Sequence, residues 1–140
     1  MARAAFCVVN SIRAELVNFW LAPKIGEGAT VILPVYHPGA LLFLGDGHAL
    51  QGDWEPTGNG VETSMDVEFS VSVRKGVPLT GPRVETADAI ISIGSQPEFQ
   101  SSLDRALEMA TTDMVQYLMS EHGLEEWAAH FVADRVSEEV

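Results

Sequence analysis

Hydrophobic and polar residues alternate strictly over residues 61–74. Every second position there is apolar or threonine, and the positions between carry acidic, serine or arginine side chains. The apolar face comprises Val61, Thr63, Met65, Val67, Phe69, Val71 and Val73. Because successive side chains of a strand point to opposite faces of a sheet, this period of two predicts one long strand with a core face and a polar face.

Three shorter apolar runs predict further strands. Residues 29–33 (ATVIL) are rich in β-branched side chains, and residues 87–93 (ADAIISI) are followed by a glycine. Residues 40–44 (ALLFL) are apolar throughout, which is typical of a strand buried on both faces. Turn-forming prolines and glycines separate the runs. We therefore expect a mostly antiparallel β-sheet or barrel-like core over about residues 29–94.

Helical spacing replaces the alternation after residue 100. Ser101 is a good N-cap with Asp104 in the first turn, and Gly123 suits the position that ends a helix. The apolar residues between them recur three or four positions apart: Leu103, Leu107, Ala110, Met114 and Leu118. These features predict a helix over about residues 101–122 that packs through its apolar stripe.

Two other segments show helical spacing. Residues 125–136 place Trp127, Phe131 and Val136 on one side, which predicts a second C-terminal helix with these side chains facing the core. Near the N-terminus, similar spacing predicts a short amphipathic helix that ends before Pro23. Its apolar residues are Ile12, Leu16, Phe19 and Trp20. Strands followed by helices are an α+β pattern, and 140 residues have the size of one domain, so we expect a single α+β domain over residues 1–140.

The composition argues against several classes of partner. The chain carries 20 acidic and 8 basic residues, a formal net charge of −12, with no basic cluster that could neutralise phosphates. We therefore expect neither nucleic acid nor an anionic membrane surface as a partner. Cys7 is the single cysteine, so no internal disulfide is possible. The apolar stretch 4–9 is too short for a signal peptide, and together these features predict a cytoplasmic protein.

Carboxylate and imidazole side chains gather in residues 46–55. Asp46 and His48 are two positions apart, and Asp53 and Glu55 repeat this spacing. In an extended chain both members of such a pair leave the same face and can bind one divalent cation. Oxygen plus nitrogen ligands suit zinc, which lowers the pKa of bound water towards about 7. An Asp-x-His pair is also common by chance, so the spacing alone leaves a metal site and an ordinary polar cluster open.

Other candidate chemistry is weaker. His37 either reaches this cluster or caps the turn at Pro38, while His122 and His130 lie near helix ends and are best explained as surface residues. No GxSxG motif is present, and Cys7 has no histidine or acid near it in sequence. The glycine-rich residues 45–60 contain no phosphate-binding motif.

The motifs LPVYHPGALLFLGDGHALQGDWE and NGVETSMDVEFSV closely resemble the acetamidase/formamidase family. The later segments PRVETADAIISIGS and YLMSEHGL resemble the family's C-terminal part, and the likeness covers about residues 25–124. The resemblance implies a mostly β fold with a helical C-terminal portion, and cytosolic homo-oligomers that use a divalent metal. It also implies hydrolysis of short aliphatic amides, such as formamide and acetamide, to ammonia and the carboxylate.

The resemblance assigns roles by position. Asp46, His48 and Asp53 would hold the metal, which is expected to be zinc. Water activated by this metal would attack the amide carbonyl, and Glu55 or Glu62 would move the proton to the leaving ammonia.

Departures from the family pattern keep a second hypothesis open. The resemblance relates the chain to the C-terminal half of a family member, as a truncated relative, and Trp54 stands where the family has glycine in QGDGE. The alternative is a catalytically impaired relative that serves as a metal-binding or oligomerisation module. In either case we expect a homo-oligomer, because a half-length β-rich chain leaves sheet edges and apolar surface to cover.

Overall fold

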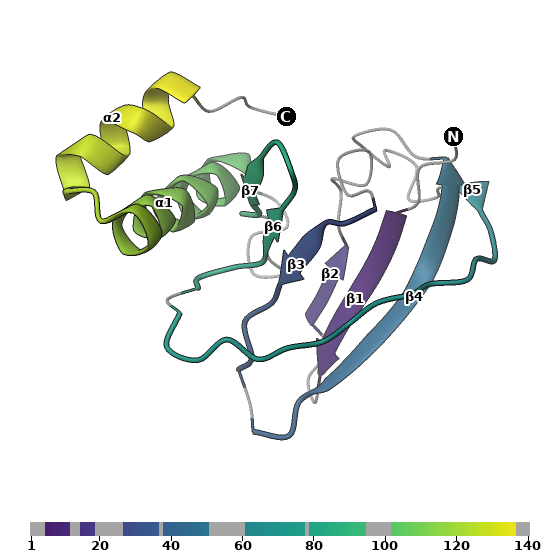
Figure 1. Cartoon of the computed structure of the whole chain (residues 1–140). Helices are drawn as coiled ribbons and strands as arrows, with labels where there is room; N and C mark the ends of the chain where they lie inside the picture. The colour runs from purple at the N-terminus through teal and green to yellow at the C-terminus, as the bar shows by residue number, and fades with distance from the viewer. Residues whose placement is uncertain are drawn as a thin grey trace. The chain divides into compact units, whose positions relative to one another are not determined.

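The computed structural model describes residues 5–11, 15–18, 27–36, 38–50, 61–77, 79–94 and 102–136. These residues form antiparallel sheets followed by two C-terminal helices, which confirms the α+β class (Figure 1). The chain divides into two compact units. Unit 1 comprises Met1–Ala29 and Val35–Val77, and unit 2 comprises Thr30–Pro34 and Pro78–Val140. That residues 1–140 act as one domain stays a prediction.

Unit 1 contains a four-stranded antiparallel sheet. Its strands are β1 (Ala5–Ser11), β2 (Glu15–Asn18), β4 (Leu41–Leu50) and β5 (Val61–Glu62), in the order β2-β1-β4-β5. The central pairing of β1 with β4 places Val8 opposite Leu44, and Val9 opposite Phe43. Facing β-branched and apolar positions suit neighbouring strands. The described strands form open sheets, so the barrel-like closure we allowed for is not seen among them.

The helix predicted around residues 12–20 is wrong, because residues 15–18 are strand β2. Val8 lies opposite Val17 and Val9 opposite Leu16, so β2 finds its hydrogen-bond partners on β1. A few apolar residues at helical spacing cannot outweigh such pairing, since a neighbouring strand satisfies the backbone hydrogen-bonding groups.

Strand β4 is longer than predicted and less buried. The predicted strand at 40–44 is present, but it continues to Leu50 and carries the predicted metal-binding residues Asp46 and His48 within it. Burial on both faces is wrong, because Leu41, Leu42 and Leu44 are exposed.

The long strand predicted over residues 61–74 is wrong beyond Glu62. Residues 63–75 belong to no strand in the described part of the chain, although their alternation is intact. A strand requires a neighbouring backbone as well as a suitable pattern. Among the described residues, the strand pairing with β4 covers only Val61 and Glu62.

Unit 2 contains a three-stranded antiparallel sheet. Its strands are β3 (Thr30–Ile32), β6 (Arg83–Glu85) and β7 (Ile90–Ser92), in the order β3-β6-β7. The strands predicted at 29–33 and 87–93 are therefore confirmed, each somewhat shorter. The Thr86 hydroxyl accepts hydrogen bonds from the backbone N–H of Asp88 and Ala89, which closes the turn between β6 and β7.

Helices α1 (Leu103–His122) and α2 (Glu126–Val136) confirm the two predicted C-terminal helices. The N-cap of α1 is Ser102 rather than Ser101, because the Ser102 hydroxyl accepts the Arg105 backbone N–H at 3.3 Å. Gly123 ends α1 with φ +64°, as predicted, and this left-handed conformation favours glycine.

Small residues form the contact between the helices. Val115, Ala129 and Ala133 are buried together, and Met114, Leu118 and Leu124 pack against them. Trp127, Phe131 and Val136, predicted to face inward, are instead exposed, Trp127 by 75%. Alanine lets two helices approach closely, and the large side chains lie on another side of α2.

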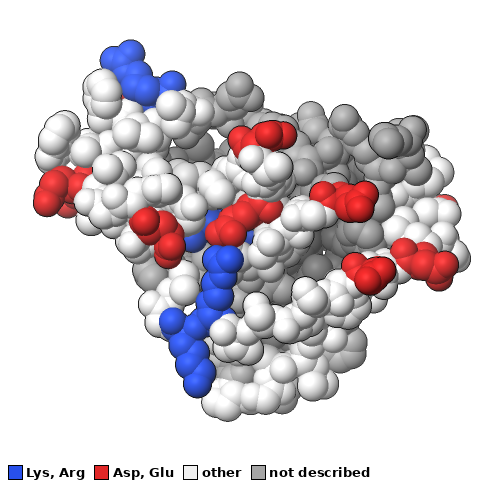
Figure 2. Space-filling model, in the orientation of Figure 1, with Lys and Arg blue, Asp and Glu red and all other residues white. Residues whose placement is uncertain are grey.

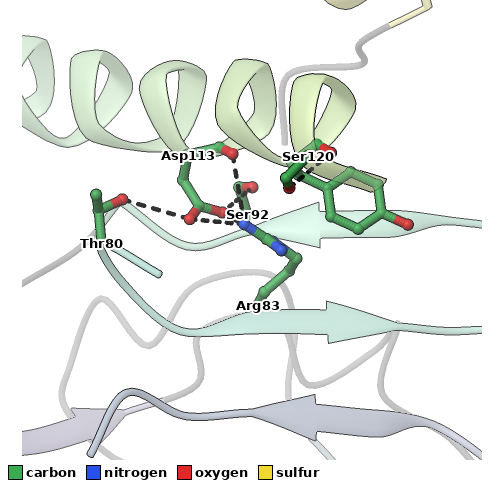
Figure 3. A network of polar contacts seen from close by, with 6 residues as sticks. Thr80, Arg83, Ser92, Asp113 and Ser120 are labelled. Atoms are coloured by element: carbon green, nitrogen blue, oxygen red, sulfur yellow. Dashed lines mark hydrogen bonds and ion pairs between the residues drawn. The ribbon is translucent and has the colours of Figure 1, made fainter. Parts of the chain in front are cut away.

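A buried ion pair ties α1 to the sheet of unit 2. Asp113 on α1 lies 2.8 Å from the Arg83 guanidinium, and both side chains are almost fully buried. Figure 3 shows the Asp113 carboxylate pointing towards Arg83, Ser92 and Thr80. The hydroxyls of Ser92 and Thr80 also donate hydrogen bonds to this carboxylate. Arg83 also stacks on the Tyr117 ring, with Cζ 4.6 Å from its centroid. The carboxylate therefore receives hydrogen bonds on both oxygens, as a buried charge requires.

Among the described residues, neither α1 nor α2 combines the length and apolar character that a bilayer crossing demands.

Candidate active site

His48 and Glu62 form the centre of the candidate site. They lie directly opposite each other on the neighbouring antiparallel strands β4 and β5. His48 Nε2 is 3.2 Å from Glu62 Oε1. The His48 side chain is only 5% exposed, whereas the Glu62 side chain is 63% exposed. Opposite residues of an antiparallel pair share one face of the sheet, so the strand pairing itself brings these two groups together.

A glycine holds the following segment close to β4. The Thr63 N–H donates to the Gly47 carbonyl at 2.8 Å. A Cβ on Gly47 would lie 3.2 Å from the Thr63 carbonyl oxygen and 2.9 Å from Met65 Cε. Glycine therefore permits a close approach here, and that approach fixes the backbone next to Glu62.

The described residues contain only part of the predicted site. Asp46 lies in β4 two positions before His48, and Glu62 lies beside His48. Asp53 and Glu55 lie outside the described residues, as do His37 and Trp54. In the part of the chain that is described, no three His, Cys, Asp or Glu side chains come together. The metal set of Asp46, His48 and Asp53 stays a prediction.

The pair can act chemically in two ways. An imidazole nitrogen and a carboxylate oxygen 3.2 Å apart are close enough to bind one divalent cation together. Without a shared cation, the carboxylate accepts a hydrogen bond from Nε2 and so fixes the tautomer and orientation of the ring. Both arrangements use a buried imidazole whose partner reaches solvent.

Sequence reasoning found both residues but missed their contact. They are 14 positions apart, and the alternation of residues 61–74 predicts only that Glu62 lies on the polar face of a long strand. The usable signal is the family segment NGVETSMDVEFSV, which contains Glu62 and begins at Asn59, four positions after the cluster at residues 46–55.

The chain is similar to a known protein family over most of its length. Residues 22–129 match the model of the Acetamidase/Formamidase family. The chain belongs to the acetamidase/formamidase family. Both His48 and Glu62 lie inside the matched residues, and the predicted family resemblance is confirmed. No curated protein matches the chain in sequence.

A solved structure shares the fold of this family member. It is an acetamidase from Yersinia enterocolitica, with 30% sequence identity and a TM-score of 0.73. The similarity covers 96% of this chain and 42% of that chain. The chain therefore spans less than half the length of the acetamidase that it matches.

Proposed function

We propose that this chain forms part of a hydrolase that cleaves the carbon–nitrogen bond of short aliphatic amides. Formamide and acetamide are the proposed substrates, and ammonia and the carboxylate are the products. The observation that carries the proposal is the buried His48 held 3.2 Å from Glu62, within the residues that match an amidase family. The likeness to a protein named as an acetamidase supports the same reaction.

The proposed cofactor is a divalent cation, zinc, because imidazole nitrogen and carboxylate oxygen are ligands that suit it. The imidazole of His48 would hold it, with Asp46 and Asp53 as the other ligands. The chemistry that zinc supplies when bound is polarisation of a carbonyl and a lowered pKa for bound water. Burial of His48 suits this role, because a ligand shielded from solvent is held in one orientation.

Glu62 is the proposed proton carrier. Its carboxylate is mostly exposed, so it can accept a proton at the site and release it to the leaving ammonia or to solvent. Contact with His48 Nε2 keeps this carboxylate beside the reacting groups. Glu55 is the second candidate for the same step.

Ammonia release and metal content test the proposal together. The 140-residue chain, loaded with zinc, is expected to release ammonia from formamide or acetamide. His48→Gln is expected to lose both the bound zinc and the activity, whereas His130→Gln, an exposed histidine on α2, should keep both. Activity that survives His48→Gln unchanged would rule out this site.

The second candidate function is a metal-binding or oligomerisation module without catalysis. The observation that favours it is the length of the matched acetamidase, of which this chain covers 42%. Stoichiometric zinc bound through His48, with no ammonia released from either amide, would favour the module over the hydrolase.

A further inference from the structure

One edge of β4 is largely unpaired in the described part of the chain. On one side, β1 pairs with β4 between Leu41 and His48. On the other side, β5 pairs only with His48 and Leu50, so no described strand faces residues 41–46 there. The exposed apolar side chains along this stretch are Leu41, Leu42 and Leu44. An open edge beside apolar side chains is a template on which a further strand can form.

The segment that follows β5 has begun to pair with this edge. The Thr63 N–H donates to the Gly47 carbonyl, one position beyond the pair of His48 and Glu62. A Cβ built on Gly47 would lie 2.9 Å from Met65 Cε, so Met65 also lies beside β4. In Figure 1 the chain then turns away from the line of β4, and residues 66–76 are all exposed. The pairing therefore stops although the alternation of apolar and polar residues continues.

We propose that residues 63–69 dock on the open edge of β4 and extend β5 into a longer strand. The covalent link to β5 fixes the antiparallel direction of this pairing. The hydrogen bond between Thr63 and Gly47 fixes where it starts. A different register would require that this bond and the pair of His48 and Glu62 be broken.

Apolar burial favours the docked strand. Val67 and Phe69 are 42% and 58% exposed in the undocked segment. Because side chains alternate along a strand, both would share the face on which Met65 already lies beside Gly47. Docking would therefore cover these side chains together with the exposed leucines of β4.

Charge opposes the docked strand. The same alternation would place Asp66 and Glu68 on the face of Glu62, so three carboxylates would line one side of the strand. Figure 2 shows carboxylate groups spread over the face drawn, and the formal net charge is −12. Repulsion among like charges destabilises such an arrangement, and salt weakens the repulsion. Two opposing terms of this kind make docking reversible and dependent on ionic strength.

Docking would also change how Glu62 is held. Glu62 is the last residue of β5, and its carboxylate is 63% exposed. In the docked state it would lie inside a strand, with backbone pairing on both sides of it. The carboxylate would then stay beside His48 Nε2, from which it is 3.2 Å away. This consequence rests on the proposed function of Glu62 as proton carrier, whereas the docking itself does not.

Amide hydrogen exchange of the unchanged chain, measured by NMR, tests the docked strand. Backbone N–H groups alternate between the two sides of a strand, so those of Val67 and Phe69 would face β4, as that of Thr63 does. They are expected to exchange about tenfold more slowly than those of Asp66 and Glu68. Raising the ionic strength from about 0.01 to 0.15 M should increase this difference, because it shortens the Debye length from about 30 to 8 Å. Equal exchange at all four positions, or slow exchange at Asp66 and Glu68 instead, would overturn the proposal.

Proline at two neighbouring positions tests the direction of the N–H groups. Val67→Pro removes an N–H that faces β4, so it should abolish the slow exchange at Phe69. Glu68→Pro is the matched control, because it removes an N–H that faces away from β4, which an edge strand tolerates. Both side chains are exposed, so circular dichroism should show the same secondary structure for both variants. Loss of the slow exchange in both variants would contradict the docked pairing.

Ammonia release separates this inference from the proposed function. If docking positions Glu62, Val67→Pro should lower kcat by about tenfold or more, and Glu68→Pro should leave it near that of the unchanged chain. Equal kcat values for the two variants, in a chain that docks, would overturn the role of docking in the site. A chain that docks but releases no ammonia would refute the proposed function and leave the docked strand standing.

Discussion

At the scale of single residues, Glu62 shows how a contact defines a role. Its Oε1 lies 3.2 Å from His48 Nε2, and most of its side chain reaches solvent. A group placed in this way can orient the imidazole, carry a proton, or do both. Glutamine separates these roles, because it keeps an oxygen acceptor for Nε2 but cannot take up a proton.

We expect Glu62→Gln to lower kcat for amide hydrolysis by about 100-fold, the range of a lost proton-transfer group. Zinc content should stay near that of the unchanged chain. Glu68→Gln, an exposed glutamate of the same unit, is the matched control and should keep its rate. Full activity of Glu62→Gln would mean that Glu62 only orients His48.

Gly94 lies so close to the backbone of α1 that no side chain fits at this position. A Cβ at this position would overlap the Ala106 carbonyl oxygen of α1 and lie 2.9 Å from the Ala110 backbone nitrogen. The helix cannot yield without losing its packing on the sheet. We expect Gly94→Ala to destabilise the protein by about 3 kcal/mol in urea unfolding, as overpacking does.

Gly45→Ala is the control for this substitution. No atom lies within 4 Å of a Cβ at Gly45, and its φ is not in the left-handed region. We expect its unfolding midpoint to stay close to that of the unchanged chain. A comparable loss of stability in both variants would show that steric overlap with α1 is not the cause.

At the scale of elements, the Arg83–Asp113 pair joins β6 to α1. Arg83 Nε donates a hydrogen bond to Asp113 Oδ2 at 3.0 Å, and Nη2 donates one to Oδ1 at 2.8 Å. The guanidinium therefore binds the carboxylate in a bidentate manner. Removing one partner leaves the other charge buried without compensation, whereas removing both leaves no such charge.

We expect Asp113→Ala and Arg83→Met each to cost about 3–5 kcal/mol of unfolding free energy, and the double variant to cost much less than their sum. The exposed pair of Arg105 and Glu108 gives the contrast, since Arg105→Met should cost at most about 0.5 kcal/mol. Chemical denaturation of the unchanged chain, the two single variants and the double variant measures the coupling free energy between Arg83 and Asp113. Additive costs for Arg83 and Asp113 would contradict a shared buried contact.

At the scale of the whole molecule, zinc is expected to stabilise the folded chain. A ligand that binds the folded state alone adds stability, about 2.7 kcal/mol at a hundredfold excess over its dissociation constant. We therefore expect EDTA to lower the melting temperature and zinc to restore it, measured by calorimetry. The melting temperature of the His48→Gln variant should be the same with and without EDTA. A melting temperature of the unchanged chain that does not respond to EDTA would count against a zinc site.

The sequence by itself determined the class of the fold, the family and the two C-terminal helices. Those features depend on local patterns. Gly123 marks the end of α1, and strand-forming runs occur at residues 29–33 and 87–93. The motif around Asp46 and His48 is specific to the family. Such patterns depend only on residues that are close in sequence, so they can be recognised without knowing which residues are close in space. For the same reason, the sequence named His48 and Glu62 as candidates without showing that they touch.

Only the tertiary structure decided which patterns found partners. The alternation of residues 61–74 became a strand only at Val61–Glu62, where β4 supplies a backbone, and the helical spacing near Leu16 yielded to pairing with β1. Trp127 is exposed because Ala129 and Ala133 make the closer helix contact. Pairing and burial depend on residues distant in sequence, so a periodic pattern specifies a face but not what covers it.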